Sequence, residues 1–72
     1  MEIQRVKDLI QAGIPGAEVE VTGDGSHFDC VVTSQEFEGK NPLQRQRLVM
    51  ATVKAQIESG ELHALSIKTL IP

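Results

Sequence analysis

The fold of this chain depends most on the segment Asn41-Pro42-Leu43-Gln44-Arg45-Gln46-Arg47-Leu48-Val49, which continues to Ile57. Asn41 is a good N-cap, and Pro42 suits the first helical position because its missing N–H would be unpaired there anyway. Gly60 follows as a stop signal. The stretch predicts one long amphipathic helix over residues 41–57, interrupted on its apolar side by Gln46. Its apolar residues at helical spacing are Leu43, Val49, Met50, Val53 and Ile57.

The composition limits what kind of protein this is. Seventy-two residues make one domain, residues 1–72, near the lower size limit for unaided folding. Aromatic residues are 3% of the chain, so a pocket that stacks bases or sugars on rings is not expected. The net charge of −3 disfavours nucleic acid, and the single Cys excludes an internal disulfide. Without a signal segment or a membrane-length apolar run, we expect a soluble cytoplasmic protein.

The residues before the long helix predict a short helix and a β-hairpin. A first amphipathic helix spans residues 1–12 and is ended by Gly13. Alternating apolar residues predict a strand over 17–22, a turn at 23–26 and a partner strand over 27–33. The expected core face of the partner strand carries Phe28, Cys30 and Val32.

A last strand is predicted after the long helix, over residues 61–71, with Leu65 and Ile67 facing one way. Two strands of one sheet joined through a helix form a right-handed crossover and lie parallel. The predicted fold class is therefore α+β, a two-layer α-β-β-α-β domain. Its three-stranded mixed sheet has helices on one face and leaves the other face open.

This topology brings the two histidines to one edge of the sheet. His27 opens the second strand and His63 opens the third. Parallel neighbours start at the same edge about 5 Å apart, so the imidazoles are expected within roughly 5–10 Å of each other. Strict alternation would place them on opposite faces, so at least one must belong to a loop. Gly23 and Gly25 predict a turn before His27 that is free to move.

Three separated motifs closely resemble the BolA family. They are Phe37-Glu38-Gly39-Lys40 with the following Leu43-Gln44-Arg45-Gln46-Arg47-Leu48-Val49, then His63-Ala64-Leu65-Ser66-Ile67-Lys68-Thr69, and the hairpin Gly23-Asp24-Gly25-Ser26-His27-Phe28. The hairpin resembles the bacterial branch of the family. The resemblance covers nearly the whole chain and implies a class II KH-like fold. The chain departs from the family at Gln46, where many relatives have a histidine.

The resemblance also implies a cofactor and a partner. Family members act with monothiol glutaredoxins in iron–sulfur cluster trafficking or iron and redox regulation, and share a [2Fe–2S] cluster with them. The implied metal ligands are His63 and His27. Cys30 is the less favoured alternative, because its core-facing position indicates a buried, inert thiol. A cluster needs four ligands, so glutaredoxin and glutathione would supply the others, and the isolated protein is expected to hold no cluster.

The sequence offers two alternatives to this function. A DNA-binding transcriptional regulator would use the KH-like fold, but Gly39-Lys40-Asn41-Pro42 lacks the second glycine of the GXXG loop. On a helical wheel Arg47 and Lys54 share one side and Arg45 points away, which predicts no compact patch. The candidate nucleic-acid-binding residues are Lys40, Arg45, Arg47 and Lys54. Enzyme activity is not expected, because no Ser/His/Asp or Cys/His arrangement is present.

A second, smaller apolar stripe lies on the long helix, formed by Leu48, Ala51 and Ala55. We expect the first helix to pack there. The alternative is a partner surface, including a homodimer contact.

Overall fold

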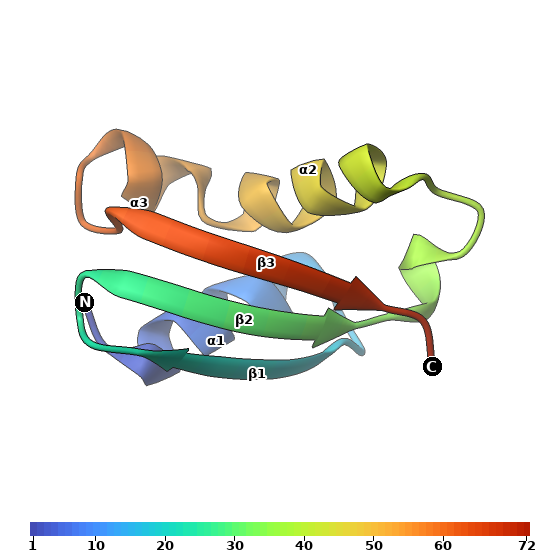
Figure 1. The fold of residues 1–72 in the computed structure, drawn as a ribbon, viewed down its shortest axis with the longest axis horizontal. Coiled ribbons are helices and arrows are strands. Elements are labelled where there is room, and N and C mark those ends of the chain that lie inside the picture. The colour runs from blue at the N-terminus through green and yellow to red at the C-terminus, as the bar shows by residue number, and fades with distance from the viewer.

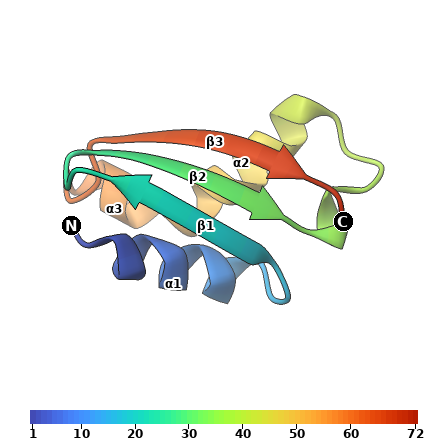
Figure 2. The same ribbon diagram turned by 60° about the horizontal axis from the view of Figure 1, so that its bottom comes forward.

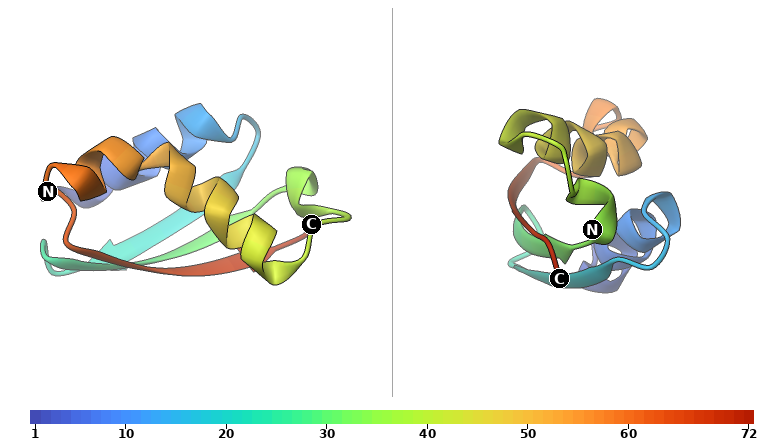
Figure 3. Two further views of the ribbon diagram at one scale, coloured as in Figure 1. Left: turned by 90° about the horizontal axis from the view of Figure 1, so that it is seen from above. Right: turned by 90° about the vertical axis from the view of Figure 1, so that its right-hand side faces the viewer.

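The computed structural model describes all residues from Met1 to Pro72. Its sheet has the order β1-β2-β3, with β1 antiparallel to β2 and β2 parallel to β3. The helices lie together on one face of the sheet, and the other face is open (Figures 1 and 3). The predicted two-layer α+β class is confirmed. The elements are α1 (Ile3–Gly13), β1 (Glu18–Gly23), β2 (His27–Thr33), η1 (Gln35–Phe37), α2 (Pro42–Thr52), α3 (Lys54–Glu58) and β3 (Ala64–Leu70).

The single long helix predicted over residues 41–57 is wrong in one respect, because the structure breaks it into α2 and α3. Its start is as expected: Asn41 and Gln44 exchange side-chain-to-backbone hydrogen bonds of 2.8 and 2.9 Å in a capping box. The break is at Val53, whose backbone leaves helical geometry at φ −120° and ψ 15°. Just before it, the Thr52 hydroxyl donates to the Val49 carbonyl at 2.6 Å. A side-chain bond of this kind favours a bend in the helix.

The buried side of α2 also differs from the predicted one. Leu43 is 57% exposed, and Gln46 is exposed as well. Val49 and Val53 are fully buried, and Leu48 is partly buried against the hydrophobic core. Gln46 therefore does not interrupt a buried surface, because the side of the helix that carries it faces solvent.

Helices α1 and α2 approach each other closely where Gly13 lies against Thr52. A Cβ atom added to Gly13 would lie 2.4 Å from Cγ2 of Thr52, so only glycine allows this approach. Leu48 packs into the core as expected, whereas Ala51 and Ala55 remain exposed. The prediction that the first helix covers the whole stripe is wrong for these two alanines.

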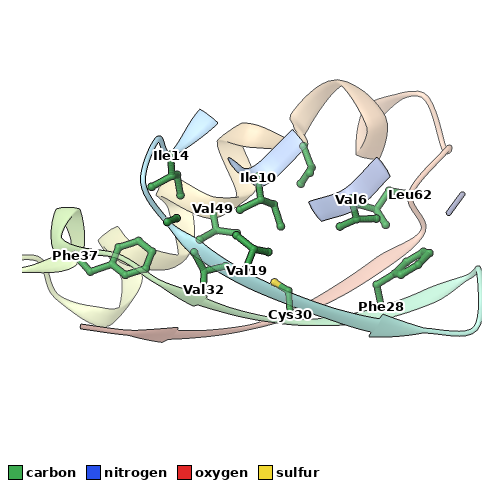
Figure 4. Close-up of a cluster of buried hydrophobic side chains, with 12 residues drawn as sticks. Val6, Ile10, Ile14, Val19, Phe28, Cys30, Val32, Phe37, Val49 and Leu62 are labelled. Atoms are coloured by element: carbon green, nitrogen blue, oxygen red, sulfur yellow. The ribbon is translucent and has the colours of Figure 1, made fainter. Parts of the chain in front are cut away.

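One hydrophobic cluster fills the space between the helices and the sheet (Figure 4). The three predicted core residues of β2 all belong to it, so the predicted strand face is confirmed. No helix in this fold has the length and apolar character needed to cross a membrane. The cluster consists of Val6, Ile10, Ile14, Ala17, Val19, Phe28, Cys30, Val32, Phe37, Val49, Val53 and Leu62.

Candidate functional site

The two histidines lie at the same end of the sheet. His27 is the first residue of β2, and its Cα partner across the parallel pair is Ala64, the residue after His63. His63 itself lies in the loop between α3 and β3 and not in the strand, and both histidines are exposed. The β1–β2 turn, the α3–β3 loop and the N-terminus share this end of the molecule (Figures 1 and 2). The requirement that one histidine belong to a loop is met by His63. We call this end, residues 23–27 and 59–63, the histidine rim.

The turn before His27 is fastened by Asp24. The Asp24 carboxylate accepts hydrogen bonds from the backbone N–H groups of Ser26 and His27 at 3.0 and 2.9 Å. These bonds, with a smaller contribution from the His27 charge, hold the pKa of Asp24 below its ordinary value. A Cβ atom at Gly23 would lie 2.5 Å from the His27 carbonyl oxygen, and Gly25 has a φ of +99°. Gly23 and Gly25 predicted a turn that is free to move. In the structure, the Asp24 carboxylate holds this turn through its two hydrogen bonds.

The loop before His63 is fastened on both sides. Leu62 is 1% exposed, and its N–H donates to the Gln56 carbonyl at 3.0 Å. Glu61 forms two hydrogen bonds with Arg5 of α1, a residue 56 positions away. Arg5 lowers the pKa of Glu61, first through the hydrogen bond and then through its charge, with a further contribution from the N-terminal amine. The pairing of Arg5 with Glu61 could not be predicted from the sequence, because no local pattern connects residues so far apart.

Cys30 lies in the core and not on the histidine rim. It is 3% exposed, and its sulfur is drawn on the core side of the sheet (Figure 4). Burial, and to a smaller extent the charge of Asp29, raises the pKa of the thiol to about 11. Side chains alternate along β2, so Cys30 and His27 face opposite sides of the sheet. The predicted buried thiol is confirmed.

The donor set of the histidine rim suits part of a metal centre. Imidazole nitrogen is an accepted ligand of iron in [2Fe–2S] centres, and two exposed histidines supply two such ligands. No three His, Cys, Asp or Glu side chains are grouped closely enough to hold a metal ion. His27 and His63 therefore fit a [2Fe–2S] cluster only if another molecule provides the remaining ligands.

The four basic residues considered for nucleic acid do not form one patch. Arg45 donates to the carbonyl oxygens of Phe37 and Lys40 at 3.0 and 2.8 Å, so its side chain holds the chain entering α2. Lys40 donates to the Glu36 carbonyl at 2.7 Å. Arg47 and Lys54 share a shallow groove on α2 and α3, as the helical wheel predicted.

Comparisons with known proteins agree with this fold. A sequence model described as BolA-like protein matches residues 7–72. An uncharacterised protein encoded in the rpoN–murA intergenic region of Acinetobacter guillouiae is 37% identical over 70 residues, which cover 97% of this chain and 84% of the relative. The acid stress protein IbaG of Escherichia coli K12 is 31% identical over 72 residues, covering 100% of this chain and 86% of IbaG. A solved BolA homologue from Coxiella burnetii has a TM-score of 0.90 at 37% identity, covering 100% of this chain and 92% of that chain.

Proposed function

This chain belongs to the BolA family, and we propose that it shares a [2Fe–2S] cluster with a monothiol glutaredoxin. The observation that supports this proposal is the position of His27 and His63 at the same exposed end of a parallel strand pair. The complex would act in iron–sulfur cluster trafficking or in iron and redox regulation.

The chemistry of the ligands makes the cluster a shared one. His63 and His27 are the two side chains that would ligate it, each through a neutral imidazole nitrogen. The glutaredoxin cysteine and the thiolate of glutathione would complete the four positions. When bound, the cluster supplies a redox-active centre and transferable iron and sulfide, with a potential that histidine ligation raises relative to thiolate ligation.

The histidine rim is suited to docking a second protein, because its ligands are exposed while their supports are fixed. His27 is set by strand pairing and by the Asp24 turn, and His63 by the buried Leu62. A ligand held by a rigid element loses less conformational entropy when it binds a metal than a ligand on a mobile segment. These supports favour a half-site in which both histidines are positioned before the partner and its ligands bind.

The direct experiment is reconstitution of the mixed complex. The protein and a monothiol glutaredoxin are combined with glutathione, iron and sulfide under anaerobic conditions and separated by size-exclusion chromatography. We expect a mixed species whose visible absorption spectrum differs from that of the glutaredoxin cluster alone, which serves as the control. If the protein elutes apart from glutaredoxin and leaves its spectrum unchanged, the proposal is wrong.

A further inference from the structure

We infer that Arg5 is a positioning residue of the histidine rim, because it fixes the loop that carries His63 through a forked ion pair with Glu61. Arg5 Nε and Nη2 lie 2.5 and 3.2 Å from the two carboxylate oxygens of Glu61. This two-bond arrangement uses the planar guanidinium, which a lysine cannot reproduce. In its consequence for the cluster, the inference rests on the proposed function.

The ion pair is the outer part of a two-part attachment between α1 and the α3–β3 loop. Val6 follows Arg5, Leu62 follows Glu61, and both of these apolar residues belong to the buried core. Figure 4 shows Val6 and Leu62 at one end of the core. The polar pair at the surface and the apolar residues beneath it therefore hold the same short segment to the same helix. His63 is the next residue after that segment.

The attachment leaves His63 little backbone freedom. The loop has only Ser59 to His63 between α3 and β3, and Gly60 takes a φ of +81° within it. The Leu62 N–H is bonded back to Gln56, and β3 begins at Ala64. If Glu61 lost Arg5 as its partner, the Glu61 side chain would no longer join the loop to α1. The buried Leu62 would then be the remaining attachment of this segment to the core. Arg5 would thus act on the metal ligand through the loop, without touching the metal.

The only other ion pair of the chain provides a matched control. Lys54 and Glu58 lie one turn apart on α3 and make a single 3.9 Å contact, with side chains 74% and 67% exposed. Arg5 and Glu61 are 50% and 37% exposed and make two bonds between distant elements. Removing Glu58 therefore takes away one acidic charge near the same loop without removing a link between α1 and that loop.

The test begins with the isolated protein and needs no glutaredoxin. Amide hydrogen exchange is measured by NMR for Arg5→Gln, Glu61→Gln and the control Glu58→Gln. We expect the Leu62 amide, whose hydrogen bond closes the loop, to exchange about two- to fivefold faster in the first two variants, as for loss of a half-exposed ion pair. It should be unchanged in the control. The amides of Cys30 and Val32 in the central strand β2 report global opening, and only a change at Leu62 beyond theirs counts. Arg5→Lys should give an intermediate rate.

The second readout is the lifetime of the [2Fe–2S] cluster in the mixed complex, which should shorten in Arg5→Gln and Glu61→Gln but not in Glu58→Gln. Unchanged Leu62 exchange in Arg5→Gln would overturn the inference, as would faster exchange with an unchanged cluster lifetime. A wild-type protein that forms no mixed cluster would refute the proposed function instead. The exchange data would then still decide whether Arg5 fixes the loop.

Discussion

His27 and His63 enter the two parallel strands one residue out of step, since His27 pairs with Ala64. This relationship depends on the direction of β3. Had β3 run antiparallel to β2, His63 would lie at the far end of a seven-residue strand, about 20 Å away at roughly 3.3 Å per residue. The parallel crossover is therefore what places both histidines at one edge of the sheet.

Replacement of the two histidines should give graded effects. His63→Ala should abolish the mixed cluster with glutaredoxin, because the motif that carries His63 is the better match to the BolA family. His27→Ala should weaken the cluster or allow a substitute ligand such as water. The measurement is the visible spectrum and lifetime of the cluster, with circular dichroism as the folding control, because both side chains are exposed. A wild-type spectrum and lifetime in His63→Ala would show that His63 is not a ligand.

Asp24 should stabilise the hairpin turn at neutral pH and lose this effect in acid. Its carboxylate has a lowered pKa in the folded protein, so the unfolded chain binds the proton more readily. The stabilisation is present above the ordinary pKa of 3.8 and fades as the pH falls below it. Asp24→Ala should therefore lower Tm more at pH 7 than at pH 3. Asp24→Asn keeps an acceptor oxygen and should lower it less; equal losses at both pH values would contradict the assignment.

Cys30 should react slowly with thiol reagents in the native protein. With a pKa of about 11, only about one thiol in a thousand is ionised at pH 8, and burial blocks access to it. The unfolded thiol ionises near 9.0, so the free energy of unfolding should fall as the pH rises from 9.0 to about 11. Cys30→Ala should lack that part of the pH dependence. Rapid labelling without denaturant, at the rate of the unfolded chain, would rule out the buried position.

Gly13 should tolerate no side chain, because α1 and α2 meet there. Gly13→Ala would bring the new methyl group into Thr52 Cγ2, and should cost about 1–3 kcal/mol in the free energy of unfolding measured with urea. Adding Thr52→Ser removes that methyl group and should recover part of the loss. If Gly13→Ala were as stable as wild type, the two helices would have to be further apart than described.

Replacing Arg45 should destabilise the protein, whereas replacing the exposed Arg47 should leave its stability nearly unchanged. Arg45→Ala removes a charged Nε–H donor that is shared between two carbonyl oxygens, and should cost about 1–3 kcal/mol in urea unfolding. Arg47→Ala removes an exposed side chain and should change stability by less than about 0.5 kcal/mol. A salt-dependent gel shift with duplex DNA that weakened in Arg47→Ala would instead favour the nucleic-acid function.

Features that depend on near neighbours in the chain could be predicted from the sequence. Asn41 and Gln44 are three residues apart, so a local pattern of residues specifies the capping box at the start of α2. Alternation alone identified the buried face of β2 from Phe28 to Val32, and the element order implied the parallel pairing. The common edge of His27 and His63 could therefore be predicted; their role as ligands stays a prediction.

Features that depend on residues far apart in the chain became visible in the folded structure alone. Periodicity counted Leu43 as a core residue, but the packing of α2 on the sheet left it exposed. The pair between Arg5 and Glu61 joins the first helix to the last loop, and two such residues carry no common signal along the chain. The physical reason is the same in each case. A cap or an alternating strand is specified by residues that touch through the local backbone, whereas these contacts exist only after the helices have packed on the sheet.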